Sequence, residues 1–207
     1  MAGLAGLAIQ KGYKVTGQDK AYYPPMSTQL TSLGIKVNQT EDIIDDLDKC
    51  DAVIIGNSLS RGNKTVEYIL DKGIEHYSGP EWIKNHILKN KYVFVVSGTH
   101  GKTTTTSMLI KILQESGKNP SYLVGGIYKD NDISYKYTSS DYFIIEGDEY
   151  DTSFFDKRSK FIHYKPDVLI INNLEYDHSD IFENIDQIKK QFHFLIRTMS
   201  KNKNIIY

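Results

Sequence analysis

The sequence predicts an α/β fold with mainly parallel sheets, arranged as two domains. Short runs rich in β-branched and aromatic residues alternate with segments whose apolar residues recur at helical spacing. This alternation is typical of βαβ units. The strings HYSGPEW and LKNKY flank a short helix and place a domain boundary near residue 90. We therefore expect one domain over residues 1–90 and a second over residues 91–207.

The first domain begins with the small-residue string AGLAGLA, which predicts a helix, and YKVTGQD follows as a strand. A Rossmann-like domain has a strand and a glycine turn before such a helix, and neither is present here. We therefore expect a truncated Rossmann-like domain. Its predicted helices lie at residues 2–11, 27–33, 66–72 and 81–88, and its predicted strands at residues 14–16 and 52–56.

The second domain begins with the β-rich run YVFVVS, which predicts a buried strand over residues 92–96. After a turn, Met108, Leu109, Ile112 and Leu113 recur at helical spacing and predict a helix over residues 103–116. The chain stops inside the strand-like string KNIIY, so we expect this domain to be incomplete as well. Further strands are predicted at residues 142–146, 168–172 and 204–206, and a further helix at residues 186–198.

Composition and charge exclude several classes of protein. The 207 residues are 40% hydrophobic and 25% charged, which is an ordinary globular balance, and the net charge of −1 favours neither nucleic acid nor an anionic membrane as a partner. Cys50 is the only cysteine, which excludes an internal disulfide and indicates a reducing compartment. No apolar run approaches the length of a membrane-spanning helix, and MAGLAGLAIQKG lacks the features of a signal peptide. We expect a cytoplasmic enzyme or binding domain.

A turn rich in glycine and hydroxyl groups joins the strand at residues 92–96 to the helix after it. Glycines let backbone N–H groups point into one concavity, and the helix N-terminus adds a positive dipole, so the turn suits a triphosphate. Lys102 supplies a charge for the β- and γ-phosphates, and the Thr103 hydroxyl can bind Mg²⁺. The predicted ATP-binding residues are Gly98, Thr99, His100, Gly101, Lys102, Thr103 and Thr104.

Two observations weigh against this interpretation of the turn. The string GKT recurs by chance, and turns rich in serine and threonine also cap helices. The usual phosphate-binding pattern has a glycine where Val96 stands. However, the strand, turn and helix follow one another in register, which favours nucleotide binding. We therefore predict that the second domain is a P-loop-type α/β domain.

An acidic run follows the strand at residues 142–146. Glu146 ends the strand, and carboxylates beside a phosphate loop suit Mg²⁺. A solvated acidic loop is the alternative for such a run. We predict that Glu146 is a Mg²⁺ ligand, and both interpretations stay open for Asp148, Glu149 and Asp151.

Polar residues also follow the strands of the first domain. Asp19 ends the string KVTGQD, at a position where such folds often contact a nucleotide ribose or base. Asn57, Ser58 and Arg61 follow the strand at residues 52–56 and can hold a diphosphate, Arg61 through paired hydrogen bonds.

Three spaced motifs resemble the Mur ligase family, the ATP-dependent amide-forming ligases of peptidoglycan synthesis. They are GTHGKTT, IIEGDEYD and NNLEYDH, and they occur in the family's order. The resemblance covers the whole chain and implies the end of a UDP-sugar-binding domain followed by the first part of the ATP-binding central domain. It also implies that ATP and Mg²⁺ are required.

The resemblance assigns roles to individual residues. Lys102 and His178 match catalytic positions, and Thr103, Glu146 and His178 match the Mg²⁺ ligands. We expect Asn173 and Asp177 to orient His178. His100 lies in the phosphate loop, from which it can reach either the nucleotide or the UDP-sugar.

Four strings indicate which family reaction the chain serves: YPPMS, IIGNSLSRGN, SGPEW and FFDKRSKFIHY. They resemble the member that joins L-alanyl-γ-D-glutamyl-meso-diaminopimelate to UDP-N-acetylmuramate in peptidoglycan recycling. The partners implied are these small molecules, with no nucleic acid and no membrane. One alternative is the member that adds L-alanine to the same sugar nucleotide. Alternatives outside the family are a non-ligase P-loop nucleotide-binding protein and a non-catalytic module that binds sugar nucleotides.

Overall fold

The computed structural model describes residues 1–43, 46–128, 133–176 and 182–207, and it confirms the predicted α/β fold class. The helices are α1 (Ala2–Gln10), α2 (Met26–Ser32), α3 (Lys64–Lys72), α4 (Gly79–Trp82), α5 (Lys102–Glu115) and α6 (Ile185–Arg197). Short 3₁₀ turns cover Leu47–Lys49 and Lys160–Tyr164, and a π-helix covers Ile83–Ile87.

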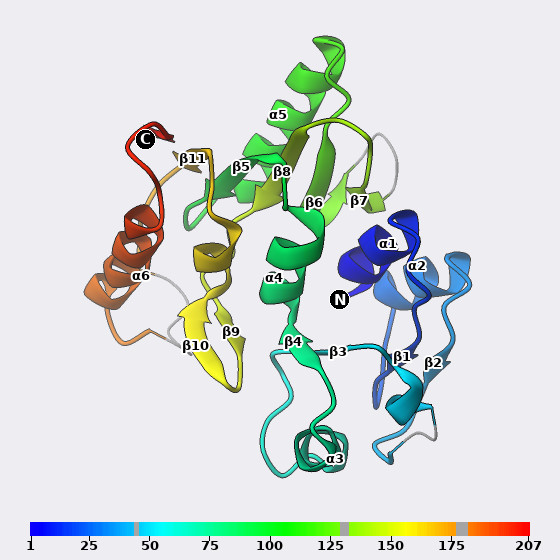
Figure 1. Cartoon of the computed structure of the whole chain (residues 1–207). Helices are drawn as coiled ribbons and strands as arrows, with labels where there is room; N and C mark the ends of the chain where they lie inside the picture. Colours follow the sequence, from blue (N-terminus) through cyan, green and yellow to red (C-terminus); the bar gives the residue numbers. More distant parts are fainter. Residues whose placement is uncertain (44–45, 129–132, 177–181) are drawn as a thin grey trace.

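Within the described residues, the strands fall into one large sheet and three two-stranded ladders (Figure 1). The large sheet contains β5 (Tyr92–Ser97), β6 (Ser121–Tyr128), β7 (Ile133–Lys136), β8 (Tyr142–Glu146), β11 (Val168–Ile171) and β12 (Asn204–Ile206). The ladders pair β1 (Gly17–Gln18) with β2 (Val37–Asn38), β3 (Val53–Ile55) with β4 (His76–Ser78), and β9 (Asp151–Ser153) with β10 (Asp156–Ser159).

The large sheet has the order β12-β11-β5-β8-β6-β7, and only the β6–β7 pair is antiparallel. Successive residues of a strand face opposite sides. On one side, Ile144 joins Ile110 of α5 in a buried cluster. On the other side, Phe143 and Ile145 pack in the main core, which includes residues of α1, α4 and α6. Helices on both faces bury the strands, as parallel sheets require.

Parallel strands place their carboxyl ends, and the loops after them, at one edge of the sheet. The segments after β5, β8 and β11 therefore meet, although they begin at residues 98, 147 and 172. These segments contain the three motifs singled out in the sequence. The fold thus assembles one candidate site from parts that are far apart along the chain.

The predicted elements differ from the structure mainly at short strands. The strand predicted at residues 14–16 is wrong in its bounds, because the pairing with β2 begins at Gly17 opposite Val37. The helix predicted at residues 81–88 begins earlier, at Gly79, where the Ser78 hydroxyl accepts a hydrogen bond from the Glu81 N–H. The sequence analysis missed the partner strands β2, β4, β6 and β7 and the β9–β10 ladder.

The small residues of α1 allow this helix to pack closely against the β6–β7 hairpin. A Cβ added at Gly6 would overlap the ring of Tyr135, and one added at Gly3 would lie 2.7 Å from Leu123 Cδ1. Tyr135 is buried in the main core with Leu4 and Leu7 of α1. The string AGLAGLA therefore joins the beginning of the chain to the large sheet.

Substituting alanine for Gly6 is expected to lower the free energy of unfolding by about 2 kcal/mol, because a methyl group would overpack this contact. Helix propensity alone predicts the opposite sign, a gain of about 1 kcal/mol. Chemical denaturation of the two proteins measures the difference. A more stable Gly6→Ala variant would contradict the packing of α1 on Tyr135.

Candidate active site

The predicted phosphate loop lies between β5 and α5, and two glycines give it its shape. Gly98 has a φ of +129°, and an added Cβ would lie 2.8 Å from the backbone oxygen of Asn173. Gly101 has a φ of +77° and is the N-cap of α5. Both conformations disfavour residues with a side chain. The loop can therefore turn its backbone toward a ligand at the positive end of α5.

Two asparagines after β11 hold this loop in place. The His100 N–H donates to Asn173 Oδ1 at 2.8 Å, and the Thr99 N–H donates to the Asn173 backbone oxygen at 3.2 Å. Asn172 Nδ2 donates to Thr105 Oγ1 at 3.0 Å, in the first turn of α5. We expected Asn173 to orient His178, and that contact stays a prediction because His178 lies outside the described residues. In the structure, the Asn173 amide contacts the loop backbone at His100. The sequence did not predict a role for Asn172, because its contact with Thr105 joins segments that are far apart in the chain.

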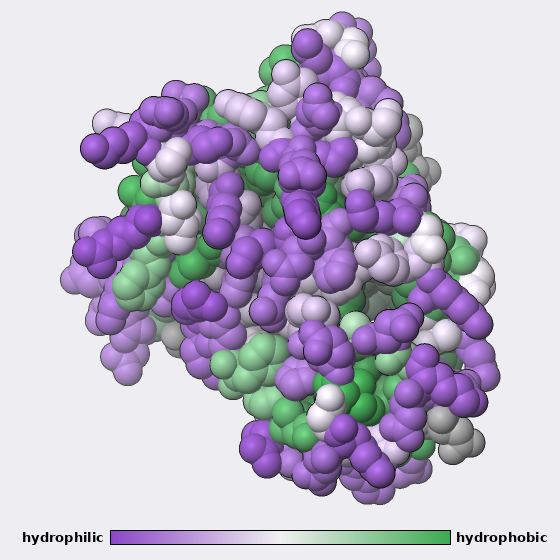
Figure 2. Space-filling model, viewed as in Figure 1, coloured by the Kyte–Doolittle hydropathy of each residue, from purple (hydrophilic) through white to green (hydrophobic). Residues whose placement is uncertain are grey.

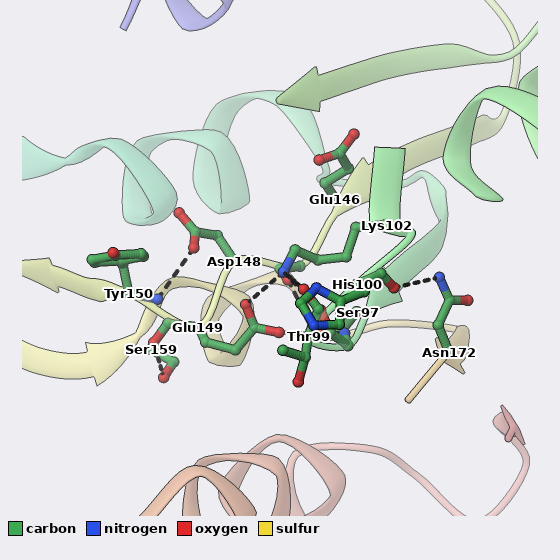
Figure 3. A network of polar contacts seen from close by, with 12 residues as sticks. Ser97, Thr99, His100, Lys102, Glu146, Asp148, Glu149, Tyr150, Ser159 and Asn172 are labelled. Carbon is green, nitrogen blue, oxygen red and sulfur yellow. Dashed lines mark hydrogen bonds and ion pairs between the residues drawn. The ribbon is translucent and has the colours of Figure 1, made fainter. Parts of the chain in front are cut away.

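The Lys102 side chain contacts the backbone of the loop that precedes it, and it pairs with Glu149 in the segment after β8 (Figure 3). Lys102 Nζ donates to the Gly98 backbone oxygen at 2.7 Å and lies 2.9 Å from Glu149 Oε2. The Glu149 side chain is 3% exposed, and its Oε1 accepts from the Gly98 N–H at 3.3 Å and from Ser97 Oγ at 3.4 Å. The sequence left the role of Glu149 open. Its place in the acidic run was the only signal for it.

Thr103 and Glu146, two predicted Mg²⁺ ligands, lie beside each other. Thr103 Oγ1 donates to Glu146 Oε2 at 3.3 Å. Glu146 Oε1 is buried and has no hydrogen-bond partner among the described residues. Burial raises the pKa of the Glu146 carboxyl above its ordinary value, although the Gly125 N–H and the Thr103 hydroxyl oppose this shift.

This pair fits a hard divalent cation, because a buried carboxylate oxygen without a partner is costly unless something binds it. Among the described residues, no three His, Cys, Asp or Glu side chains lie together in an arrangement that could hold a metal ion by themselves. The third predicted ligand, His178, and its predicted neighbour Asp177 lie outside the described residues.

The two remaining predicted loop residues are exposed. His100 projects from the loop with Nε2 3.8 Å from Glu175 Oε2, and its side chain is 65% exposed. Thr104 lies exposed in the first turn of α5. Both are accessible to a ligand, and their predicted contacts with one stay predictions.

The predicted UDP-sugar residues lie after β1 and β3. Asp19, Asn57 and Ser58 are exposed at the ends of these strands. Arg61 forms a two-point pair with Glu67, with Nε 2.9 Å from Oε1 and one terminal nitrogen 2.9 Å from Oε2. The Arg61 guanidinium and the Gly62 N–H lower the pKa of Glu67 to about 2. The Arg61 guanidinium that we assigned to a diphosphate is thus engaged with Glu67, and the diphosphate contact of Asn57, Ser58 and Arg61 stays a prediction.

Comparison with family models covers nearly the whole chain. Residues 1–91 match the model described as Mur ligase family, catalytic domain, and residues 96–207 match the Mur ligase middle domain. The chain belongs to the Mur ligase family. As a Mur ligase chain, it carries the phosphate loop, Glu146 and Glu149 in the part that matches the middle domain.

Curated relatives of this Mur ligase chain show which members it resembles. It is 50% identical over 199 residues to the UDP-N-acetylmuramate–L-alanyl-γ-D-glutamyl-meso-2,6-diaminoheptandioate ligase of Haemophilus influenzae, covering 96% of the chain. It is 48% identical over 207 residues to the ligase of that name from Escherichia coli, covering 100% of the chain. The chain spans 44% and 45% of the lengths of these two relatives. A UDP-N-acetylmuramate–L-alanine ligase of Syntrophomonas wolfei is 32% identical over 192 residues, which cover 93% of the chain and 39% of that ligase.

A solved Mur ligase structure agrees with this pattern. The crystal structure of UDP-N-acetylmuramate:L-alanyl-γ-D-glutamyl-meso-diaminopimelate ligase from Neisseria meningitides superposes with a TM-score of 0.92 at 45% identity, covering 99% of this chain and 66% of that one.

Within the described residues, no helix is long and apolar enough to cross a membrane.

Proposed function

We propose that this chain supplies the nucleotide-binding part of a ligase that joins L-alanyl-γ-D-glutamyl-meso-diaminopimelate to UDP-N-acetylmuramate. The reaction uses ATP and Mg²⁺ and belongs to peptidoglycan recycling, in the cytoplasm. The observation that carries the proposal is the identity of 48–50% to ligases named for this tripeptide, against 29–35% to six L-alanine ligases. The phosphate loop and the Lys102–Glu149 pair support ATP as the second substrate.

In the proposed reaction, the lactyl carboxylate of UDP-N-acetylmuramate attacks the γ-phosphorus of ATP, the bond to the bridging oxygen breaks, ADP leaves and an acyl phosphate forms. The amine of the tripeptide then attacks the acyl carbon, and phosphate leaves as the amide forms. The main physical difficulty is that two anions must approach each other. The chain needs no covalent nucleophile for this, because its task is to bind, orient and neutralise charge.

Lys102 and the backbone N–H groups in the first turn of α5 are the groups that would neutralise this charge. Lys102 Nζ donates to the Gly98 backbone oxygen and to Glu149 Oε2. A bound phosphate would take the place that Glu149 Oε2 has in this structure. Thr103 and Glu146 would hold Mg²⁺, with His178 as the third proposed ligand. When bound, Mg²⁺ supplies positive charge to the β- and γ-phosphate oxygens. Asn173 keeps the loop in the shape that this binding needs.

On the sugar-nucleotide side, we propose that Asp19 contacts the uridine and that Asn57, Ser58 and Arg61 contact the diphosphate. Their positions after parallel strands support this, since ligands of α/β folds bind at strand carboxyl ends. Arg61 would exchange Glu67 for the diphosphate, and His100 would reach between the two nucleotides.

Competition between acceptors tests the proposed substrate. The full-length ligase is given UDP-N-acetylmuramate, ATP and equal amounts of L-alanine and the tripeptide, and the products are separated by mass. We expect the tripeptide product to predominate. Predominance of the mono-alanyl product would favour the L-alanine ligase. Failure to trap an acyl phosphate with hydroxylamine would instead favour a P-loop protein or a sugar-nucleotide module that is not a ligase.

Substituting glutamine for Glu146 is expected to raise the Mg²⁺ concentration needed for half-maximal ATP binding by about tenfold or more, because the buried oxygen that lacks a partner is lost as a ligand. A titration of Mg²⁺ at fixed ATP measures this. Asp148→Asn in the same segment is the control, because Asp148 Oδ2 pairs with Lys160 at 2.7 Å instead. Equal shifts in the two variants would argue against Glu146 as a ligand.

A further inference from the structure

A cavity of about 460 Å³ lies at the start of β5, away from the phosphate loop. Its walls include the apolar side chains of Leu88, Val93 and Tyr164, and three of its lysines are Lys84, Lys89 and Lys165. Val93 is near the beginning of β5, and the phosphate loop begins five residues later, about 17 Å along an extended strand. The cavity therefore opens at the opposite edge of the sheet from the candidate active site.

The charge of this cavity is entirely positive. Lys91 also lines it, and no aspartate or glutamate does in the part of the chain that the structure describes. Lys91 Nζ donates to the backbone oxygens of Thr138 and Ser140, so its ammonium group is held in place. Among the described residues, Lys84, Lys89 and Lys165 form no ion pair. In Figure 2, strongly hydrophilic surface lies over α4 and the chain that leads from it to β5.

The backbone around this cavity is irregular in three places. Lys84 and Asn85 lie in the π-helix Ile83–Ile87, and such segments occur frequently at functional sites. Asn90, between two of the lysines, has a φ of +65°, and Lys165 has a φ of +46°. Glycine adopts this left-handed conformation at lower cost than lysine does. A lysine at position 165 therefore has a backbone cost that glycine would avoid.

We propose that this cavity is a second anion site, which binds a small phosphorylated molecule through Lys84, Lys89 and Lys165. The phosphate groups would neutralise the three lysines, and the apolar wall would take the rest of the molecule, as in other small-molecule sites. Lys84 and Lys89 lie in the part matching the first family model, and Lys165 in the part matching the middle-domain model. A bound anion therefore bridges the two parts of the chain.

Calorimetric titration of the 207-residue chain with inorganic pyrophosphate tests this site. The protein used is the Lys102→Ala, Glu149→Gln variant, in which the phosphate-loop lysine and its buried partner are both replaced. We expect one pyrophosphate per chain and a rise in melting temperature on binding. Adding Lys84→Ala, Lys89→Ala and Lys165→Ala should weaken the affinity at least tenfold. The matched control is Lys14→Ala, Lys36→Ala and Lys201→Ala, which removes the same charge from exposed positions and should change the affinity less than twofold.

Lys165→Gly is the variant that keeps the test valid if the triple variant folds poorly. Glycine relieves the left-handed backbone while it removes the ammonium group, so the melting temperature should not fall although pyrophosphate affinity does. Equal losses in the cavity triple and the control triple would show non-specific attraction and overturn the proposal. Unchanged affinity in Lys165→Gly, or no binding to the starting chain, would overturn it as well.

Discussion

Replacing Lys102 with alanine is expected to lower kcat/KM of the full-length ligase for ATP by about 10²–10³, because a charge that acts on the transition state is lost. The position of Lys102 supports this expectation, because its ammonium group lies 2.7 Å from the Gly98 backbone oxygen in the loop. Steady-state kinetics with UDP-N-acetylmuramate and tripeptide measure the effect. Near-normal turnover in Lys102→Ala would contradict the assignment of the phosphate loop.

The same substitution also affects stability, because it leaves Glu149 without its cation. The two side chains are 18% and 3% exposed, so removing one partner is expected to cost about 3 kcal/mol of unfolding free energy. Lys102→Ala with Glu149→Gln is the control, since it removes both charges and should recover most of the stability. Activity should stay low in this double variant, which separates loss of charge from loss of fold. Recovery of activity would show that Lys102 acts only through the fold.

Substituting alanine for Gly98 is expected to cost about 3 kcal/mol of unfolding free energy and to abolish detectable ATP binding. A methyl group there would lie 2.8 Å from the Asn173 backbone oxygen and 3.0 Å from its nitrogen, at a φ of +129°. The loop or the segment after β11 must move to accept it. Thermal unfolding and calorimetric titration with ATP measure the two effects on the same sample.

Gly117→Ala is the control for backbone strain alone. Gly117 has a φ of +74°, but nothing lies within 4 Å of the Cβ that would be added. We expect it to cost about 1 kcal/mol and to leave ATP binding unchanged. If Gly98→Ala costs no more than Gly117→Ala and still binds ATP, the close approach to Asn173 is not what requires glycine in the loop.

The elements that the sequence predicted well are those with strong local patterns. The strands β8 and β12 have the predicted bounds, and α5 begins one residue before the prediction. Some of the missed elements have no such pattern. The partner strands β2 and β4 have two and three residues, too few for a periodic signal, and only pairing with β1 and β3 defines them.

The sequence by itself determined the strand, glycine turn and helix to which we assign phosphate binding, because these three parts are contiguous in the chain and interact locally. Only the tertiary structure decided which distant groups complete the site. Glu149 reaches Lys102 across 47 residues and Asn173 reaches His100 across 73, contacts that depend on neighbouring parallel strands ending at one edge. The packing of Gly6 on Tyr135 is of the same kind. Periodicity along a chain says which face of an element is buried, but the partner on that face is set by how the elements assemble.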